Sequence, residues 1–118
     1  MKTPFVKMHG NGNDFVIIDN IKQNFRKDIK LIKKIANRRI GIGCDQLILI
    51  EKSDEYDAFM RIYNNDGSEA EMCGNAARCV ASLLMAGTKK TKICIETNSA
   101  LLNASLEKNN EICVKMSI

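Results

Sequence analysis

Aromatic residues are scarce in this sequence. Its 118 residues include four phenylalanines, two tyrosines and no tryptophan, and these are not interleaved with basic residues. The net charge is only +4; eight of the 18 lysines and arginines lie in two segments, residues 30–39 and 89–92, and the others are scattered along the chain. A nucleic-acid surface needs clustered positive charge, usually with aromatic side chains beside it. We therefore expect no nucleic-acid partner and interpret the basic segments as solvated surface.

Long apolar runs are also missing. No uninterrupted apolar stretch is longer than that of Leu47–Ile50, and the first ten residues contain no extended apolar core of the kind that a signal peptide requires. The sequence therefore predicts a soluble cytoplasmic protein with no membrane partner.

No Cys-x-x-Cys pair is present among the five cysteines, which are Cys44, Cys73, Cys79, Cys94 and Cys113. An odd number at these spacings argues against a disulfide framework and against a structural zinc site. We expect reduced thiols in a reducing compartment and no bound metal. The pair Gly41-x-Gly43 lacks the third glycine and the following helix of a dinucleotide-binding motif.

The remaining pattern predicts one α+β domain over residues 1–118, a size and composition typical of a single hydrophobic core. An Asn-Gly turn at 11–12 joins two β-prone runs, 5–9 and 15–19, as expected for a hairpin. Further strands are expected at 47–51, 58–64, 92–97, 101–106 and 112–118. Short polar connections and few strand–helix–strand alternations favour a mostly antiparallel curled sheet.

Two helices are expected. Asp28 can cap an amphipathic surface helix that presents Ile29, Ile32, Ile35 and Ala36 on one face and ends near Gly41. Residues 75–85 are apolar nearly all round, and Gly87 can end them. A helix of that composition belongs in a core, so we place it at the centre of the curled sheet.

Cys73 is the strongest candidate for chemistry, because Gly74 and Asn75 follow it at the start of the buried helix. A helix N-terminus offers unpaired N–H groups and the positive end of the helix dipole, which favour a thiolate and can bind an anion. Gly74 lets the backbone approach a ligand, and Asn75 adds a polar donor. Cys73 could instead fill space in the core, as free cysteines often do.

The other candidate residues are weaker. We interpret Cys79, Cys94 and Cys113 as core cysteines, and packing is also the better explanation for Cys44, although its loop could approach a site. His9, the single histidine, could act as a general base but is more often structural in such a position. Amide side chains stand at element ends or in turns, where together they could line a site for a zwitterion: Asn11, Asn13, Gln46, Asn64 and Asn75.

Four segments resemble, in order and spacing, the N-terminal half of the diaminopimelate epimerase family. They are Met8-His9-Gly10-Asn11-Gly12-Asn13-Asp14-Phe15, Gly41-Ile42-Gly43-Cys44-Asp45-Gln46, Arg61-Ile62-Tyr63-Asn64-Asn65-Asp66-Gly67-Ser68-Glu69 and Cys73-Gly74-Asn75-Ala76-Ala77-Arg78-Cys79. The resemblance implies one half of a pseudo-symmetric, two-domain fold in which the substrate lies between the halves. It also implies roles for individual residues. Cys73 would be one of two catalytic cysteines, and the amino acid would be contacted by Asn13, Gln46, Asn64, Gly74 and Asn75.

The same resemblance implies an epimerase that works without pyridoxal phosphate or metal. One cysteine thiolate would remove the α-proton from one face while the second cysteine, as a thiol, protonates the other face. That second cysteine would belong to a C-terminal half beyond Ile118, so we expect the 118-residue chain alone to be inactive. Apolar surface left where that half docks would favour self-association, for example as a homodimer.

Three other functions remain open from the residues. The chain could belong to a racemase of the same architecture that acts on another amino acid, such as histidine. It could be a thiol redox protein in which Cys73 cycles with Cys79 or Cys44, although the lack of Cys-x-x-Cys disfavours this. It could also be an amino-acid-binding module without catalysis.

Overall fold

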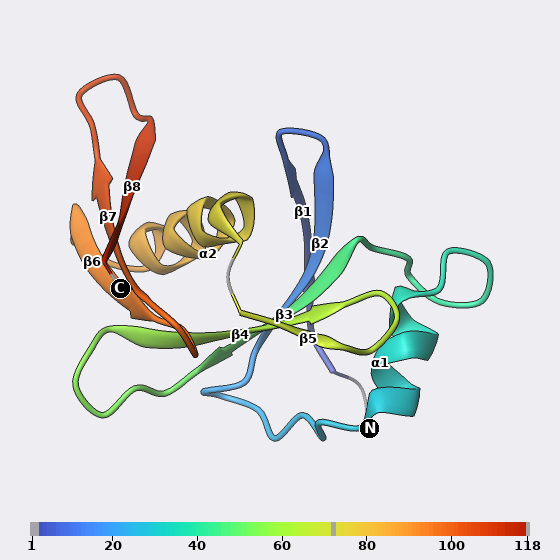
Figure 1. Ribbon diagram of the computed structural model, residues 1–118. Coiled ribbons are helices and arrows are strands. Elements are labelled where there is room, and N and C mark those ends of the chain that lie inside the picture. Colours follow the sequence, from blue (N-terminus) through green and yellow to red (C-terminus); the bar gives the residue numbers. More distant parts are fainter. Residues whose placement is uncertain (1–2, 72, 118) are drawn as a thin grey trace.

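The computed structural model describes residues 3–71 and 73–117 (Figure 1). Its strands are β1 (Val6–Gly10), β2 (Asn13–Asp19), β3 (Gln46–Glu51), β4 (Ala58–Asn64), β5 (Glu69–Ala70), β6 (Lys92–Glu96), β7 (Leu101–Leu106) and β8 (Ile112–Ser117). Its helices are α1 (Ile29–Ala36) and α2 (Gly74–Ala86). Within the described residues, neither helix is long and apolar enough to cross a membrane.

All strands belong to one sheet in the order β1-β2-β3-β4-β6-β7-β8, with β5 added beside β4. The pairings are antiparallel except β2 with β3 and β4 with β6, which are parallel. The sheet curls so that α2 lies inside the curve and contacts both edge strands, β1 and β8 (Figure 1). The predicted α+β class, with a mostly antiparallel curled sheet around a central helix, is confirmed.

Both faces of the central strands are covered, which explains the short continuous apolar runs. Along β2, Phe15 and Ile17 face the α2 side of the sheet, whereas Val16 and Ile18 pack in the cluster that contains Ile32 of α1. Each of these side chains is at most 2% exposed. Burial of such a side chain contributes about 1.5–3 kcal/mol, so these two clusters supply much of the stability of the fold.

The β1–β2 hairpin forms as predicted, with Gly10 paired to Asn13 across a two-residue turn. Asn11 and Gly12 have φ values of 51° and 88°. Two positive φ angles in succession are typical of the type I′ turn that Asn-Gly favours.

Helix α1 begins after Asp28, whose carboxylate accepts the backbone N–H of Lys30 at 3.0 Å. It ends at Ala36, earlier than predicted. The Asn37 side chain accepts the N–H groups of Arg39 and Ile40 at 2.8 and 3.2 Å, and these bonds compete with another helical turn.

Several burial predictions were wrong. Ile29 is 58% exposed and does not belong to the buried face of α1. Cys94 and Cys113 are only half-buried and stand outside both core clusters, because they alternate with core residues along β6 and β8. Helix α2 is less uniformly buried than its composition suggests, since Arg78 and Ser82 are exposed. Ile118, placed in the last predicted strand, lies outside the described residues.

Candidate functional site

The sheet topology brings three of the predicted amide residues to one edge. Asn13 begins β2, Gln46 begins the parallel strand β3, and Asn64 ends the antiparallel strand β4. Gln46 is paired directly with Asn64 and lies beside Phe15, two residues after Asn13. All three side chains are half-buried. This edge can therefore present amide groups to a bound molecule.

The N-terminus of α2 joins this edge. Cys73 occupies the cap position with extended backbone, φ −149° and ψ 112°, and its side chain makes no capping hydrogen bond. Cys73 and Asn75 are half-buried, whereas Gly74 between them is exposed. The Cys73 thiol packs against the core cluster beneath the sheet but is not sealed inside it.

A series of side-chain hydrogen bonds ties α2 to β2, and we call Asn11, Asn75, Asn13 and Asp45 the first amide row. Asn75 Nδ2 donates to Asn13 Oδ1 at 2.8 Å, and Asn13 Nδ2 donates to Asp45 Oδ2 at 3.3 Å. Asn11 Nδ2 donates to Asn75 Oδ1 at 3.2 Å. Two predicted site residues that lie 62 positions apart in the sequence, Asn13 and Asn75, are thus in direct contact.

A second amide row comprises Gln46, Asn64, Ser68 and Asp66. Gln46 Nε2 donates to Asn64 Oδ1 at 3.0 Å, and Asn64 Nδ2 donates to Ser68 Oγ at 3.2 Å. Ser68 Oγ in turn donates to Asp66 Oδ1 at 2.6 Å. The row follows the β4–β5 connection, which leads within a few residues to Cys73.

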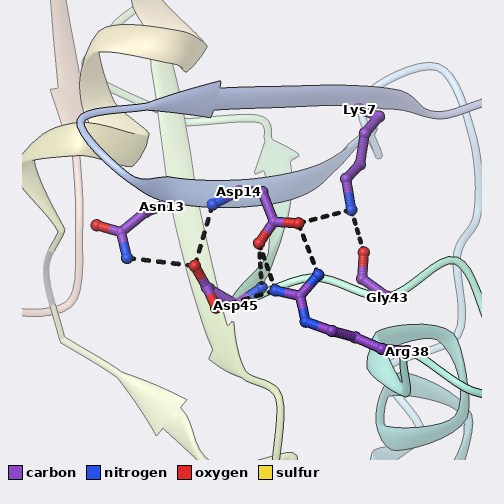
Figure 2. Close-up of polar contacts among 6 residues, drawn as sticks. All are labelled: Lys7, Asn13, Asp14, Arg38, Gly43 and Asp45. Atoms are coloured by element: carbon purple, nitrogen blue, oxygen red, sulfur yellow. Dashed lines mark hydrogen bonds and ion pairs between the residues drawn. The ribbon is translucent and has the colours of Figure 1, made fainter.

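An ionic cluster supports the first row from the side of α1 (Figure 2). Arg38 donates to both oxygens of Asp14, at 2.9 and 2.7 Å, and to Asp45 Oδ1 at 3.1 Å. Lys7 Nζ lies 2.9 Å from Asp14 Oδ2 and also donates to the Gly43 carbonyl. Asp45 accepts the Asp14 backbone N–H at 3.1 Å and returns its own N–H to Asp14 Oδ1 at 2.9 Å. These contacts hold the loop before β3 against the start of β2.

This cluster changes the acidity of Asp14. The hydrogen bonds from Arg38, together with Lys7 and the Asp45 backbone, hold the Asp14 pKa well below its usual range, although partial burial opposes them. Because the folded state favours the carboxylate, its contribution to stability is complete above about pH 4 and is lost as the pH falls below that.

We expect the free energy of unfolding to fall by about 1 kcal/mol more in the wild-type chain than in Asp14→Asn when the pH drops from 7 to 3. Urea unfolding at both pH values measures the difference. Asp14→Asn should already be less stable at pH 7. Equal losses in the two proteins would mean that Asp14 gains nothing from Arg38.

The remaining candidates are two cysteines and the histidine. Cys44 is fully buried in the α1-side cluster and Cys79, on α2, is buried in the other core cluster, and burial raises the pKa of both thiols. The prediction that both pack in the core is confirmed. His9 is exposed and lines a cavity of about 270 Å³ together with Asn75 and Arg78.

In residues 3–71 and 73–117, no three His, Cys, Asp or Glu side chains are grouped as metal ligands. Four further residues support the amides and were not predicted from the sequence: Asp14, Arg38, Asp45 and Ser68. In the pairs Asn13-Asp14 and Asp45-Gln46 a carboxylate stands next to a predicted amide in the sequence. That these pairs lie close together could be inferred only from the parallel pairing of β2 with β3.

Comparison with known proteins identifies the family. Residues 5–117 match the diaminopimelate epimerase family. The chain belongs to this family. It is 50% identical over 104 residues to the diaminopimelate epimerase of Acidiphilium cryptum, covering 88% of this chain and 38% of that protein. It is 45% identical over 121 residues to that of Nitrosomonas europaea, covering all of this chain and 44% of that protein. The chain thus spans less than half the length of these family members.

Solved structures share the fold at low sequence identity. A hydroxyproline epimerase from Agrobacterium vitis, with bound trans-4-hydroxy-L-proline, has a TM-score of 0.68 at 15% identity over 97% of this chain and 40% of that protein. A phenazine biosynthesis protein of the PhzF family from Bacillus anthracis has a TM-score of 0.64 at 22% identity over 98% of this chain and 40% of that protein. The curled sheet around a central helix therefore recurs in larger proteins.

Proposed function

We propose that this chain is one half of a cofactor-independent epimerase that interconverts LL- and meso-diaminopimelate. The observation that carries the proposal is that a hydrogen bond joins the α2 N-terminus, which follows Cys73, to the first amide row, while the pairing of β3 with β4 brings Gln46 and Asn64 together, in a chain of this family. The substrate contacts would come from Asn13, Gln46, Asn64, Gly74 and Asn75.

The proposed chemistry follows from what inversion requires. A base must remove the α-proton from one face and an acid must protonate the opposite face, so two groups must flank the α-carbon. Cys73 supplies one of them. The N–H groups that begin α2 would bind the α-carboxylate and stabilise the negative charge that develops as the proton leaves.

The second acid/base group would belong to another half of the protein. The chain covers 44% of the Nitrosomonas europaea family member, which leaves room for a second domain of similar size. We propose that residues 1–118 form one domain and that closure of the two halves completes the site and excludes water. The amide rows would then line one wall of the cleft.

The test compares the 118-residue chain with a completed enzyme, in which the chain is joined to the second half of the Nitrosomonas europaea enzyme. We expect the completed enzyme to interconvert LL- and meso-diaminopimelate and the chain alone to be inactive. Chiral chromatography of the products measures this. Inversion of histidine but not of diaminopimelate by the completed enzyme would contradict the substrate assignment.

A further inference from the structure

The amide groups at the proposed site have a fixed direction, which the chemistry of their neighbours imposes. An ionised carboxylate can only accept hydrogen bonds and a guanidinium can only donate them, whereas an amide side chain can turn over and do either. A row of amides that ends on a carboxylate therefore has one allowed orientation for each member.

In the first amide row the fixed end is Asp45. Its Oδ2 accepts from both the Asp14 backbone N–H and Asn13 Nδ2. With its NH₂ group held there, Asn13 can offer only Oδ1 to Asn75, which must donate. The Asn75 oxygen then points away, where Arg78 Nη1 approaches it at 3.5 Å and Asn11 at 3.2 Å. The Arg78 guanidinium can only donate, so its position beside the Asn75 oxygen agrees with the amide direction that Asp45 sets.

The second amide row follows the same rule. Asp66 accepts the Ser68 hydroxyl at 2.6 Å and its backbone N–H at 2.9 Å, so the hydroxyl hydrogen is committed to the carboxylate. Ser68 Oγ can therefore only accept from Asn64, which turns the Asn64 oxygen toward Gln46.

We propose that Asp45 is a positioning residue that fixes the amide direction of Asn13 and Asn75. Ser68, held by Asp66, does the same for Asn64 and Gln46. Each committed NH₂ group keeps one further hydrogen, and these N–H groups, with those that begin α2, give the site an excess of donors. Such a site fits a carboxylate. The assignment of these hydrogens to the substrate rests on the proposed function, whereas the amide directions do not.

The test measures hydrogen exchange of the side-chain NH₂ groups by ¹H–¹⁵N NMR in the 118-residue chain without substrate. Asp45→Ala removes the acceptor, so exchange of the Asn13 NH₂ group should become roughly tenfold faster. Asp45→Asn should restore slow exchange. Two donors converge on Oδ2, whereas among the described residues Arg38 alone donates to Oδ1, so the asparagine oxygen should stay at the Oδ2 position.

Asp57→Ala is the matched control. Asp57 also pairs with a cation, Lys90 at 2.7 Å, and accepts a backbone N–H, from Cys94 at 2.8 Å, but it contacts neither amide row. The Asn13 exchange rate should stay within about twofold of wild type in this variant. If Asp45→Asn behaves like Asp45→Ala, the charge pair with Arg38 is what matters and the positioning role is wrong.

Ser68→Ala provides a second, milder variant at an exposed position, which keeps the test decisive even if Asp45→Ala does not fold. We expect roughly tenfold faster exchange at the Asn64 NH₂ group and no change at Asn13. Unchanged exchange at Asn64 would overturn the role of Ser68. Because substrate is absent, slow exchange in the wild type combined with an inactive completed enzyme would reject the proposed function and keep the amide directions.

Discussion

Replacing Cys73 by alanine in the completed enzyme is expected to reduce the rate of diaminopimelate inversion by about 10²–10⁴-fold, the usual contribution of one general acid or base. The cap position of Cys73 is extended backbone, and its side chain makes no capping hydrogen bond. Alanine therefore removes the sulfur without removing a capping hydrogen bond of α2. Steady-state kinetics in both directions measure the effect.

The matched control is Cys94→Ala. Cys94 is also half-buried but lies on β6, outside the core clusters and away from both amide rows. The rate should remain within about twofold of wild type in this variant. An equal loss of rate in both variants would mean that cysteine replacement acts through folding, and Cys73 would lose its proposed role.

Replacing Gly74 by alanine is expected to separate stability from binding. Within residues 3–71 and 73–117, a Cβ added at Gly74 would meet no atom within 4 Å beyond its chain neighbours and the adjacent helix backbone. The free energy of unfolding should therefore be unchanged or raised by up to about 1 kcal/mol, because alanine favours a helix more than glycine does. In the completed enzyme, however, the methyl group would displace a carboxylate bound at the α2 N-terminus, and kcat/KM should fall by roughly 10²-fold.

Gly87→Ala tests whether that loss is specific. Gly87 ends the same helix and has equally open space around an added Cβ. We expect urea unfolding of both variants to resemble wild type and only Gly74→Ala to lose activity. Full activity in Gly74→Ala would show that no ligand approaches the start of α2, contrary to the proposal.

Local sequence patterns predicted the elements well because their determinants are local. The Asn11-Gly12 turn, the Asp28 cap and the apolar stretch after Gly74 each depend on residues within one or two turns of chain. The predicted ends of the helices and strands agree less well with the structure. Asn37 stops α1 by bonding to the next backbone N–H groups, a competition that periodicity does not reveal.

The composition of the proposed site was predictable, but its assembly was not. Asn13, Gln46 and Asn64 could be recognised as amides at element ends. They lie at a common edge because β2 pairs in parallel with β3. The alternation of apolar and polar residues within one strand does not reveal which strands are its neighbours. The wrong burial predictions for Cys94 and Cys113 have the same cause. The curl of the sheet decides which face of β6 and β8 packs against α2, and the sequence of a single strand does not show this.

Proton transfer at the α-carbon by Cys73 is the central step of the proposed mechanism, and ¹H NMR of LL- and of meso-diaminopimelate in D₂O with the completed enzyme tests it directly. We expect the α-proton signal to disappear as stereoinversion proceeds, with wild type and with Cys94→Ala alike. With Cys73→Ala the signal should persist over the same period. Loss of the α-proton at the wild-type rate in Cys73→Ala would contradict the account.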